Sequence, residues 1–379
     1  MRSVFFSTGT CDLEVDHVVI GGGVVGVAVG AALVEKGATL LLERHGRLGE
    51  ETTSRNSEVV HGGFYYPTNS LKTSLCVEGR QRLYTFCESY GVPVKKIGKW
   101  IVAQTGEEHF LDDIAQKAAA IGVPLRWLSQ REVSEGEPNV SCVAAVESPE
   151  TGIVDSHRLV QALEGKVLSS DGEISLATTV VAIEHTTSGF IVTAEQAGTR
   201  FTIATPVVVN SAGLAADTVA KMAMGDTFPD EYRLSFCKGR YFRYQGKPLV
   251  SRLVYPTPEP NLKGLGIHAT VDLAGSMKFG PDTEFVEDPT DFVVGDQRAP
   301  AFAAAAMRYL PTLDPSKLGA DYAGMRPKLS GPGQPFRDFV ISEETHHGLR
   351  GLVNLVGIES PGLTASLAIG AMVQNMLHK

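Results

Sequence analysis

Three glycines and one acidic residue near the start of the chain have the spacing of a dinucleotide-binding site. Gly21, Gly23 and Gly26 form a Gly-x-Gly-x-x-Gly pattern, and an acidic residue, Glu43, follows 20 residues after the second glycine. Such glycines allow a tight turn and let backbone N–H groups approach a pyrophosphate, while the carboxylate accepts hydrogen bonds from a ribose. NAD and FAD are both bound through this pattern, so these four residues do not decide between the two cofactors.

The glycine pattern lies between two predicted strands. Residues 17–20 form a short β-branched run, residues 24–36 are typical of a helix that stops at Gly37, and residues 38–42 form a second apolar run. This order is the opening of a doubly wound sheet, and it places a helix N-terminus beside the expected phosphate site. A membrane span over residues 18–34 is not expected, because five glycines interrupt this uncharged stretch.

Two later segments repeat the order of a buried strand followed by a glycine. They are residues 207–213 and residues 352–357. A final helix is expected over residues 363–377, with Ser360 suited to its N-cap and Pro361 to its first position. The N-terminus of this helix would place positive potential beside a reduced flavin, which carries negative charge near N1 and C2=O. The later segments therefore point to FAD.

The middle of the chain has a different pattern. Short strands without intervening helices are expected at residues 241–244, 262–270 and 277–280, which is typical of an antiparallel sheet. Helices are expected at residues 71–90 and 300–310. The sequence therefore predicts a second domain with its own sheet.

Length and composition exclude several classes of protein. The 379 residues fit two domains, since domains commonly have roughly 100–200 residues. A hydrophobic content of 43% rules out wholesale disorder. The net charge of −9 argues against nucleic-acid binding, which normally requires a basic face.

The five cysteines are widely spaced and include no CxxC pair. They are Cys11, Cys76, Cys87, Cys142 and Cys237. Neither a disulfide framework nor a metal site is expected, and reduced, mostly buried thiols of an intracellular protein are favoured. Residues 1–10 lack acidic residues but hold a single arginine, so an irregular terminus is favoured over a mitochondrial leader. We expect a mitochondrial location, with the cytoplasm as the alternative.

Several longer segments carry a more specific pattern. They are VVIGGGVVG near the N-terminus and residues 54–79, 98–103, 151–155, 210–217, 255–275 and 324–333. Together they resemble the FAD-dependent D-amino-acid-oxidase-like superfamily and, within it, the L-2-hydroxyglutarate dehydrogenase/oxidase branch. The resemblance covers nearly the whole chain from Asp16. The chain departs from the family in reading RNSE and HGG where the flavin loop commonly reads HNSG and HSG, and in having Trp100 for an aliphatic residue.

The resemblance implies an α/β fold with a discontinuous FAD-binding domain. The FAD-binding, Rossmann-like domain would consist of residues 14–92, 150–220 and 335–379. An inserted α+β substrate domain, with an antiparallel sheet, would consist of residues 93–149 and 221–334.

The resemblance also implies a reaction, the oxidation of an L-2-hydroxy acid by hydride transfer to flavin N5. The expected substrate is L-2-hydroxyglutarate and the product 2-oxoglutarate. Two alternatives stay open, namely an oxidase of an amino acid or a secondary amine, and a non-catalytic FAD-binding redox protein. Oxygen, a quinone and an electron-transfer protein all stay open as the electron acceptor.

Such a reaction requires a cation for the carboxylate and a base for the hydroxyl proton. Arg326 lies in a G-x-R-P turn that related flavin oxidases place over the flavin, so it is the expected carboxylate ligand. His61, in the loop that the family folds against the flavin, and His268, on a predicted strand, compete as the base, and His268 is slightly preferred. Tyr65 and Tyr255 are expected to line the pocket.

A dicarboxylate substrate calls for a second cation. Lys238 and Arg240 are the candidates, in a predicted turn before a strand. The remaining residues expected to bind the cofactor, besides the first glycines and Glu43, are Ser54, Asn56, Gly213, Gly357, Gly362, Leu363 and Thr364.

Overall fold

The structure, a computed structural model, describes residues 11–257 and 266–378. The chain divides into two compact units. Unit 1 consists of Met1–Ser54, Ser156–Phe236 and Pro327–Lys379, and unit 2 consists of Arg55–Asp155 and Cys237–Arg326.

Residues 55–92 belong to unit 2, whereas the sequence assigned them to the FAD-binding domain. The two units are groups of residues in mutual contact, whereas the predicted domains are defined by whether they bind the cofactor or the substrate. The units therefore do not test the predicted domains. The predicted domain boundaries therefore stay predictions.

Unit 1 is built on a six-stranded sheet with the strand order β10-β3-β2-β14-β22-β21. The first five strands are parallel, and β21 runs antiparallel to β22. The strands are β2 (His17–Ile20), β3 (Thr39–Leu42), β10 (Glu173–Ser175), β14 (Val207–Asn210), β21 (Val340–Glu343) and β22 (Leu352–Val356). Every residue of β2, β3 and β22 is buried, as expected for parallel strands covered on both faces. The predicted doubly wound sheet is confirmed.

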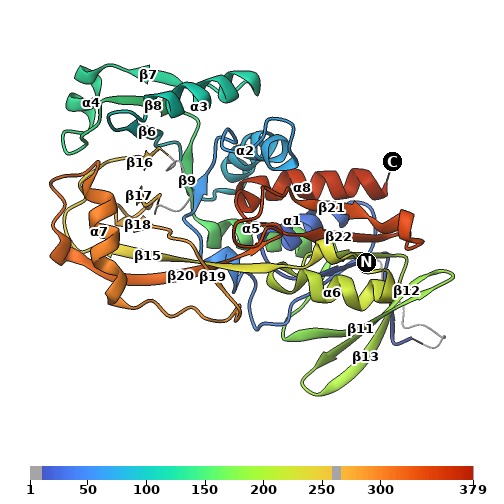
Figure 1. The fold of residues 1–379 in the computed structure, drawn as a ribbon. Helices are drawn as coiled ribbons and strands as arrows, with labels where there is room; N and C mark the ends of the chain where they lie inside the picture. Colours follow the sequence, from blue (N-terminus) through green and yellow to red (C-terminus); the bar gives the residue numbers. More distant parts are fainter. Residues whose placement is uncertain (1–10, 258–265, 379) are drawn as a thin grey trace. The chain divides into compact units, whose positions relative to one another are not determined.

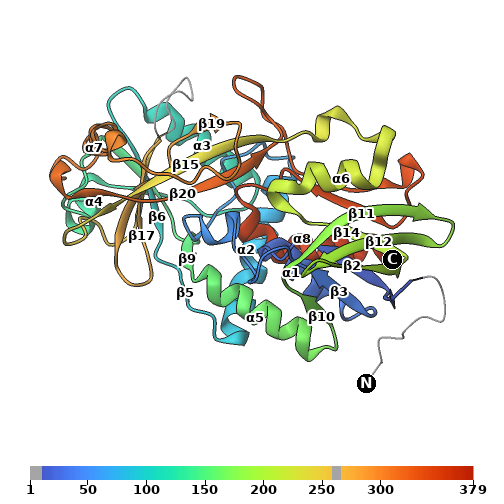
Figure 2. The same cartoon turned by 90° about the horizontal axis from the view of Figure 1, so that it is seen from below.

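Helices and a smaller sheet complete unit 1. The helices are α1 (Val24–Leu33), α5 (Ser156–Ser169), α6 (Ala216–Met224) and α8 (Gly362–Leu377). The smaller sheet consists of β1 (Leu13–Glu14), β11 (Thr178–Thr186), β12 (Gly189–Gln196) and β13 (Thr199–Thr205). Helix α1 packs against α5 and α8 (Figures 1 and 2). The contact between α1 and α8 depends on Gly370, where a Cβ atom would lie 2.6 Å from the carbonyl oxygen of Ala28.

Unit 2 contains a nine-stranded sheet with the order β19-β15-β18-β17-β16-β6-β8-β7, and β20 also pairs with β15. The strands are β6 (Lys99–Ala103), β7 (Arg126–Leu128), β8 (Ala144–Ser148), β15 (Ser235–Tyr244), β16 (Leu253–Pro256), β17 (His268–Val271), β18 (Met277–Gly280), β19 (Glu284–Val286) and β20 (Leu318–Lys328). Its helices are α2 (Leu71–Tyr90), α3 (Glu108–Ala120), α4 (Gln130–Gly136) and α7 (Ala299–Met307). A three-stranded sheet adds β4 (Val59–Val60), β5 (Val94–Lys95) and β9 (Gly152–Val154).

The large sheet has two chemically different faces. One face forms a hydrophobic core with α7, and its members include Trp100, Phe242, Val254, Ala269 and Phe279. Side chains alternate between the faces along each strand, so the residues between these members point to the opposite face. That opposite face carries the polar candidates described below.

One predicted helix has the expected boundaries, and two other predicted elements do not. Helix α2 spans the predicted residues, and Ser70 caps it by accepting a hydrogen bond from the N–H of Thr73. The predicted strand over residues 262–270 is β17, which begins at His268, and residues 262–265 of the prediction lie outside the described residues. Helix α7 ends three residues earlier than predicted.

The predicted turn at Lys238 and Arg240 was wrong, because both residues lie within strand β15. The sequence Lys238-Gly239-Arg240 resembles a turn when strand pairing is not taken into account. Strand β15 continues through this segment beyond the residues that pair with β18, and it also pairs with β19 and β20.

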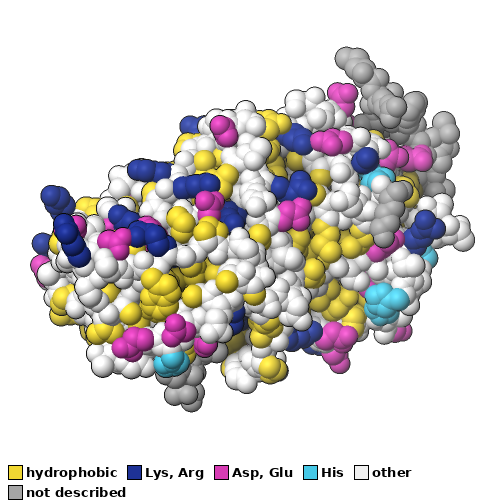
Figure 3. Space-filling model, turned by 90° about the horizontal axis from the view of Figure 1, so that it is seen from above, with side chains coloured by type: hydrophobic (Ala, Val, Ile, Leu, Met, Phe, Trp, Pro, Cys, Tyr) yellow, Lys and Arg dark blue, Asp and Glu magenta, His cyan; other side chains and the backbone are white. Residues whose placement is uncertain are grey.

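The face drawn in Figure 3 carries Lys and Arg side chains interspersed with Asp and Glu. This face therefore presents charges of both signs. Among the described residues, no helix is both long enough and apolar enough to cross a bilayer.

Candidate active site

A cavity of about 250 Å³ lies in unit 1 at the carboxyl ends of three parallel strands. Its lining includes Gly21 after β2, Glu43 after β3, and Ser211 to Gly213 after β14. The carboxyl ends of parallel strands are where open α/β sheets bind their ligands. The cavity therefore brings together four predicted residues, since Gly23 also lines it.

The glycine turn fits a pyrophosphate. Gly21 has a φ of +106°, and a Cβ atom there would lie 2.4 Å from the carbonyl oxygen of Ser211. A Cβ atom on Gly26 would lie 1.9 Å from the carbonyl oxygen of Gly21, so this glycine lets the helix pack on the turn. At Gly23 the only atom near such a Cβ is the hydroxyl of Thr53, at 3.3 Å. A side chain at position 21 or 26 would thus meet the backbone of the protein itself, whereas a side chain at position 23 would meet only the Thr53 hydroxyl among the described residues.

Helix α1 directs its positive end at the same place. Its N-cap is Gly23, which has no side chain to cap the helix, and its first turn contains no acidic residue. The peptide dipoles therefore leave positive potential at the cavity, which favours a phosphate.

Two hydrogen bonds from backbone N–H groups hold Glu43 in position at the cavity. Its carboxylate accepts hydrogen bonds from the backbone N–H of Gly22 at 2.6 Å and of His45 at 2.7 Å. Each carboxylate oxygen can accept a further hydrogen bond, as a ribose hydroxyl requires. The residues around the cavity thus fit the nucleotide part of a dinucleotide cofactor.

Six other predicted cofactor residues do not line this cavity. Ser54 donates to the carbonyl oxygens of Glu50 and Glu51. Asn56 belongs to unit 2, where its Oδ1 accepts from the N–H of Glu58 at 2.6 Å. The other four are Gly357, Gly362, Leu363 and Thr364. The cofactor contacts of all six stay predictions.

The start of helix α8 differs slightly from the prediction. The helix begins at Gly362 with Pro361 as its N-cap, so Ser360 precedes the cap. The first turn of α8 contains no acidic residue, as a site for a negatively charged group requires.

Strand register places the unit 2 candidates on one face of the large sheet. Lys99 pairs with Leu253, two residues before Tyr255, and these three side chains share a face. His268 adjoins Ala269, which pairs with the core residue Val254, so His268 points to the face of Tyr255. This face is opposite the hydrophobic core, and we call it the polar face.

His268 stacks on Tyr255 with ring centroids 3.6 Å apart and an interplanar angle of 8°. Burial lowers the pKa of His268 well below its usual value, and nearby cationic groups, above all Lys99, lower it further. The imidazole is therefore neutral at physiological pH, as a proton acceptor must be.

His61 follows strand β4 and is held by helix α2. The thiol of Cys76 donates to the carbonyl oxygen of His61 at 3.5 Å, and Arg80 donates to that of Gly62 at 3.1 Å. Burial lowers the pKa of His61 to about 3, and the charge of Lys99 contributes. Both candidate bases thus belong to one electrostatic cluster.

Arg326 also lies on the polar face, in strand β20 rather than in the expected turn. A Cβ atom on Gly239 would lie 2.7 Å from a guanidinium nitrogen of Arg326, so the glycine makes room for this side chain. The guanidinium donates to the carbonyl oxygen of Asp282 at 3.3 Å and to the thiol of Cys237 at 3.5 Å. These bonds orient Arg326, and its charge lowers the pKa of His268.

Lys238 and Arg240 point to the core face and not to the polar face. They alternate along β15 with Gly239, which lies beside Arg326 on the polar face. Lys238 donates to Asp291 at 2.8 Å, and Arg240 donates to Asp282 at 2.9 Å. Their charges are thus balanced within the protein. The role of Lys238 in substrate binding stays a prediction, and this placement does not favour it.

The sequence prediction missed Lys99. Its side chain is fully buried, and its Nζ has no hydrogen-bond partner among the described residues. The signal was a lysine at the start of a buried strand, in the segment GKWIVA. Only the pairing of β6 with β16 shows that this lysine adjoins Tyr255.

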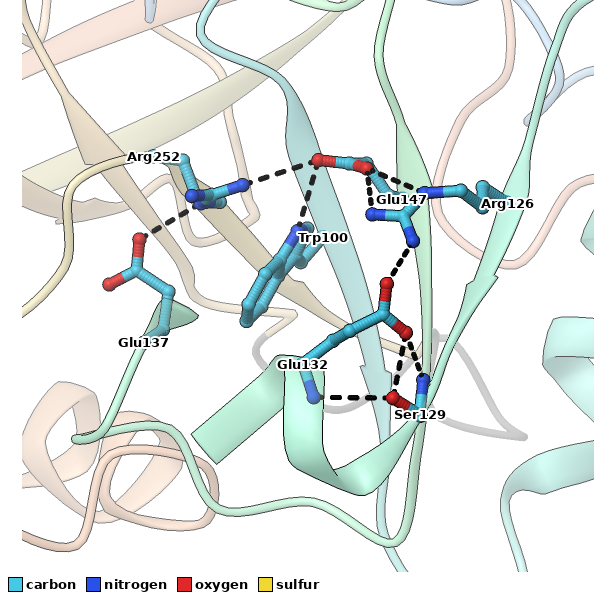
Figure 4. A network of polar contacts seen from close by, with 7 residues as sticks. All are labelled: Trp100, Arg126, Ser129, Glu132, Glu137, Glu147 and Arg252. Carbon is cyan, nitrogen blue, oxygen red and sulfur yellow. Dashed lines mark hydrogen bonds and ion pairs between the residues drawn. The ribbon is translucent and has the colours of Figure 1, made fainter. Parts of the chain in front are cut away.

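Trp100, the other departure from the family pattern, lies on the core face of β6. Figure 4 shows the guanidinium of Arg252 beside its ring, 4.5 Å from the centroid. Arg252 also donates to Glu137 at 2.9 Å and to Glu147 at 3.2 Å, and the indole N–H donates to Glu147 at 3.4 Å. Trp100 therefore belongs to a structural network on the face opposite Lys99.

Known proteins resemble this chain in sequence and in fold. The sequence pattern of the family described as FAD dependent oxidoreductase matches residues 16–376. The mitochondrial L-2-hydroxyglutarate dehydrogenase of Arabidopsis thaliana is 40% identical over 409 residues, which cover 96% of this chain and 83% of that protein. The human mitochondrial L-2-hydroxyglutarate dehydrogenase is 28% identical, and the match covers 96% of this chain and 89% of that protein.

A solved structure shows the same fold. It is a reduced L-alpha-glycerophosphate oxidase from Mycoplasma pneumoniae with FAD bound. The TM-score is 0.85 at 24% identity, and the match covers 97% of this chain and 95% of that one.

Proposed function

The chain belongs to the family of FAD-dependent oxidoreductases, and from this premise we propose that it oxidises L-2-hydroxyglutarate to 2-oxoglutarate. FAD is its cofactor, and when bound it supplies the acceptor for the hydride that leaves Cα of the substrate. The observation that carries the proposal is the polar face, where one guanidinium and a neutral imidazole occupy the same side of a sheet. The name of the Arabidopsis relative supports this choice of substrate.

Arg326 is the proposed ligand of the carboxylate beside the reacting carbon. A guanidinium presents two parallel N–H donors and grips a carboxylate with both oxygens. Gly239 and the carbonyl oxygen of Asp282 fix its position before the substrate arrives. The substrate then binds to a charge that needs little rearrangement.

His268 is the proposed acceptor of the hydroxyl proton, and His61 is the alternative. Both have a lowered pKa, so both are neutral when the substrate binds. A bound carboxylate is negatively charged and raises the pKa of a nearby imidazole. Substrate binding would therefore increase the basicity of the histidine when the hydroxyl proton must leave.

Cofactor binding by the glycine turn, Glu43 and Gly213 is part of the proposal. Two observations support it: a Cβ atom on Gly23 would approach a side-chain hydroxyl and no backbone atom, and the first turn of α1 contains no acidic residue. We also propose a mitochondrial location, supported by the names of the plant and human relatives. A small-molecule substrate and an electron acceptor are the partners of an enzyme of this kind.

A reduction assay tests the function directly. The purified holoenzyme is mixed with L-2-hydroxyglutarate without oxygen, and the visible flavin absorption should disappear. The D-enantiomer should leave the spectrum unchanged, because only one face of Cα presents its hydrogen to the flavin. Bleaching by amino acids but by no hydroxy acid would refute the proposal.

A further inference from the structure

The amine of Lys99 has an unusual environment for a charged group. Its side chain is fully buried, and within the described residues no acceptor lies in hydrogen-bonding range of Nζ. Three aromatic rings surround it, with Nζ 4.4 Å from the ring centroid of Tyr65, 4.6 Å from that of Tyr255 and 4.9 Å from that of Phe64. The rings attract a cation but do not neutralise it.

Such an arrangement is costly unless a ligand completes it. Burying an amine without a hydrogen bond to a carboxylate or carbonyl oxygen destabilises the charged form. Burial accordingly lowers the pKa of Lys99 to about 7. A negative group placed beside Nζ would restore the charged form.

A second donor without a partner lies in the same cluster. The hydroxyl of Tyr65 is buried, and the described residues offer it no hydrogen-bond partner. An ammonium and a phenol together can hold the two oxygens of one carboxylate. Two buried donors thus belong to neighbouring side chains, and the described residues offer an acceptor to neither.

The position of this pair matches the proposed substrate. Lys99 is on the polar face with His268 and Arg326, and its charge lowers the pKa of His268. The substrate has two carboxylates, and Arg326 accounts for one of them. The other two candidate cations are already paired, Lys238 with Asp291 and Arg240 with Asp282.

We propose that Lys99 and Tyr65 form the subsite for the second carboxylate of a dicarboxylate substrate. The proposal rests on the proposed function and adds the residues that distinguish a dicarboxylic from a monocarboxylic 2-hydroxy acid. The lysine stem is flexible, so Nζ can turn toward a carboxylate that enters beside the Tyr65 ring. Tyr65 is partly exposed as a residue, whereas its hydroxyl is buried.

The first test measures the binding of dead-end acids to the holoenzyme. Glutarate has both carboxylates, and pentanoate has the same carbon chain with only one. Lys99→Met removes the amine at similar volume, and it should weaken glutarate binding roughly 10- to 100-fold, as expected for the loss of a hydrogen bond between charged groups. Pentanoate binding should stay within a factor of about two of the wild-type value. Equal losses for both acids, or no loss for glutarate, would overturn the proposal.

Two further variants keep this test decisive. Tyr65→Phe keeps the ring and removes only the hydroxyl, so it should also weaken glutarate binding selectively. This variant decides the test if Lys99→Met does not fold. Lys96→Met is the matched control, because Lys96 is exposed and bridges to Glu150. It should bind both acids as the wild type does.

Proton uptake distinguishes an ion pair from simple packing. Lys99 has a pKa of about 7 without ligand, so at pH 8 most molecules carry the neutral amine. Glutarate should then draw a proton onto Nζ, and its affinity should fall as the pH rises above about 7. Calorimetry in buffers of different ionisation enthalpy measures this uptake. It should disappear in Lys99→Met, and uptake that persists in the variant would contradict the role of Lys99.

The subsite and the proposed function can fail separately. If glutarate binding depends on Lys99 but L-2-hydroxyglutarate does not reduce the flavin, the subsite stands and the function fails. If the flavin is reduced but Lys99→Met and Tyr65→Phe leave glutarate binding unchanged, the function stands and the subsite fails. In the second case the two buried donors bind water or nothing.

Discussion

The imidazole of His268 lies flat against the phenol ring of Tyr255, with 3.6 Å between the ring centroids. The strands that carry them, β17 and β16, are neighbours in the sheet, so backbone pairing fixes both side chains. Stacking leaves the ring nitrogens at the edge of the pair. It thereby orients a proton acceptor without using one of its nitrogens.

Replacing Tyr255 should test this positioning. Tyr255→Leu should slow flavin reduction roughly 2- to 10-fold, since an aromatic pair contributes about 0.5–1.5 kcal/mol. Tyr255→Phe keeps the stacked ring and should restore most of the rate. Stopped-flow absorbance measures both, and a Phe variant as slow as the Leu variant would assign the effect to the hydroxyl.

Replacing the histidines should identify the base. His268→Ala should lower the rate of flavin reduction roughly 10²- to 10⁴-fold, the usual contribution of a general base. His61→Ala should cost much less. The reverse order would make His61 the base, and equally small losses in both would remove histidine from this role. The FAD spectrum of each variant serves as the check on folding.

Replacing Arg326 should separate binding from chemistry. Arg326→Lys keeps the charge but loses the paired donors, so KM for L-2-hydroxyglutarate should rise roughly 10- to 100-fold. The amount of FAD bound should not change. Steady-state kinetics with an artificial acceptor measure KM, and an unchanged KM would exclude Arg326 from the carboxylate site.

Two of the glycines should respond differently to substitution. Gly23→Val should abolish FAD binding while the protein stays folded, because the side chain would fill the ligand's space. Gly26→Ala should destabilise the protein by at least about 1 kcal/mol, because its Cβ meets the carbonyl oxygen of Gly21 at 1.9 Å. Flavin content and thermal unfolding distinguish these effects. A Gly23→Val protein that is yellow would contradict the assignment of the cavity.

The activity should resist acid. A base must be neutral, and protonation inactivates it as the pH falls through its pKa. Burial lowers the pKa of His61 to about 3 and that of His268 well below 6.5. The kcat/KM should therefore not decrease as the pH falls through 6.5, and it should decrease only at more acidic values. A half-maximal value near pH 6.5 would show that neither histidine is shifted in solution.

The sequence was sufficient where chemistry and structure are local. Gly21, Gly23 and Glu43 belong to one continuous strand–turn–helix–strand segment, so their spacing alone predicted that they would line one cavity. The family pattern similarly singled out Arg326 and His268. These residues are recognisable without knowledge of which strands pair.

The sequence was insufficient where strand register decides which face of the sheet a side chain occupies. Lys99 and Tyr255 are far apart in the chain, and only the pairing of β6 with β16 puts them on the same face. Lys238 was expected in a turn, where either orientation is open. Its place in β15 fixes the orientation toward the core face, because side chains alternate along a strand.

The order of the segments of unit 1 has a consequence for biosynthesis. Strands β2 and β3 leave the ribosome early, but β14, whose loop completes the cavity, and β22, which flanks β14, follow far later. The nascent chain must therefore hold an incomplete cofactor cavity while the first segment of unit 2, Arg55–Asp155, is translated. Loading with FAD is accordingly expected only after β14 and helix α6 have been translated, and not when the glycine turn first leaves the ribosome.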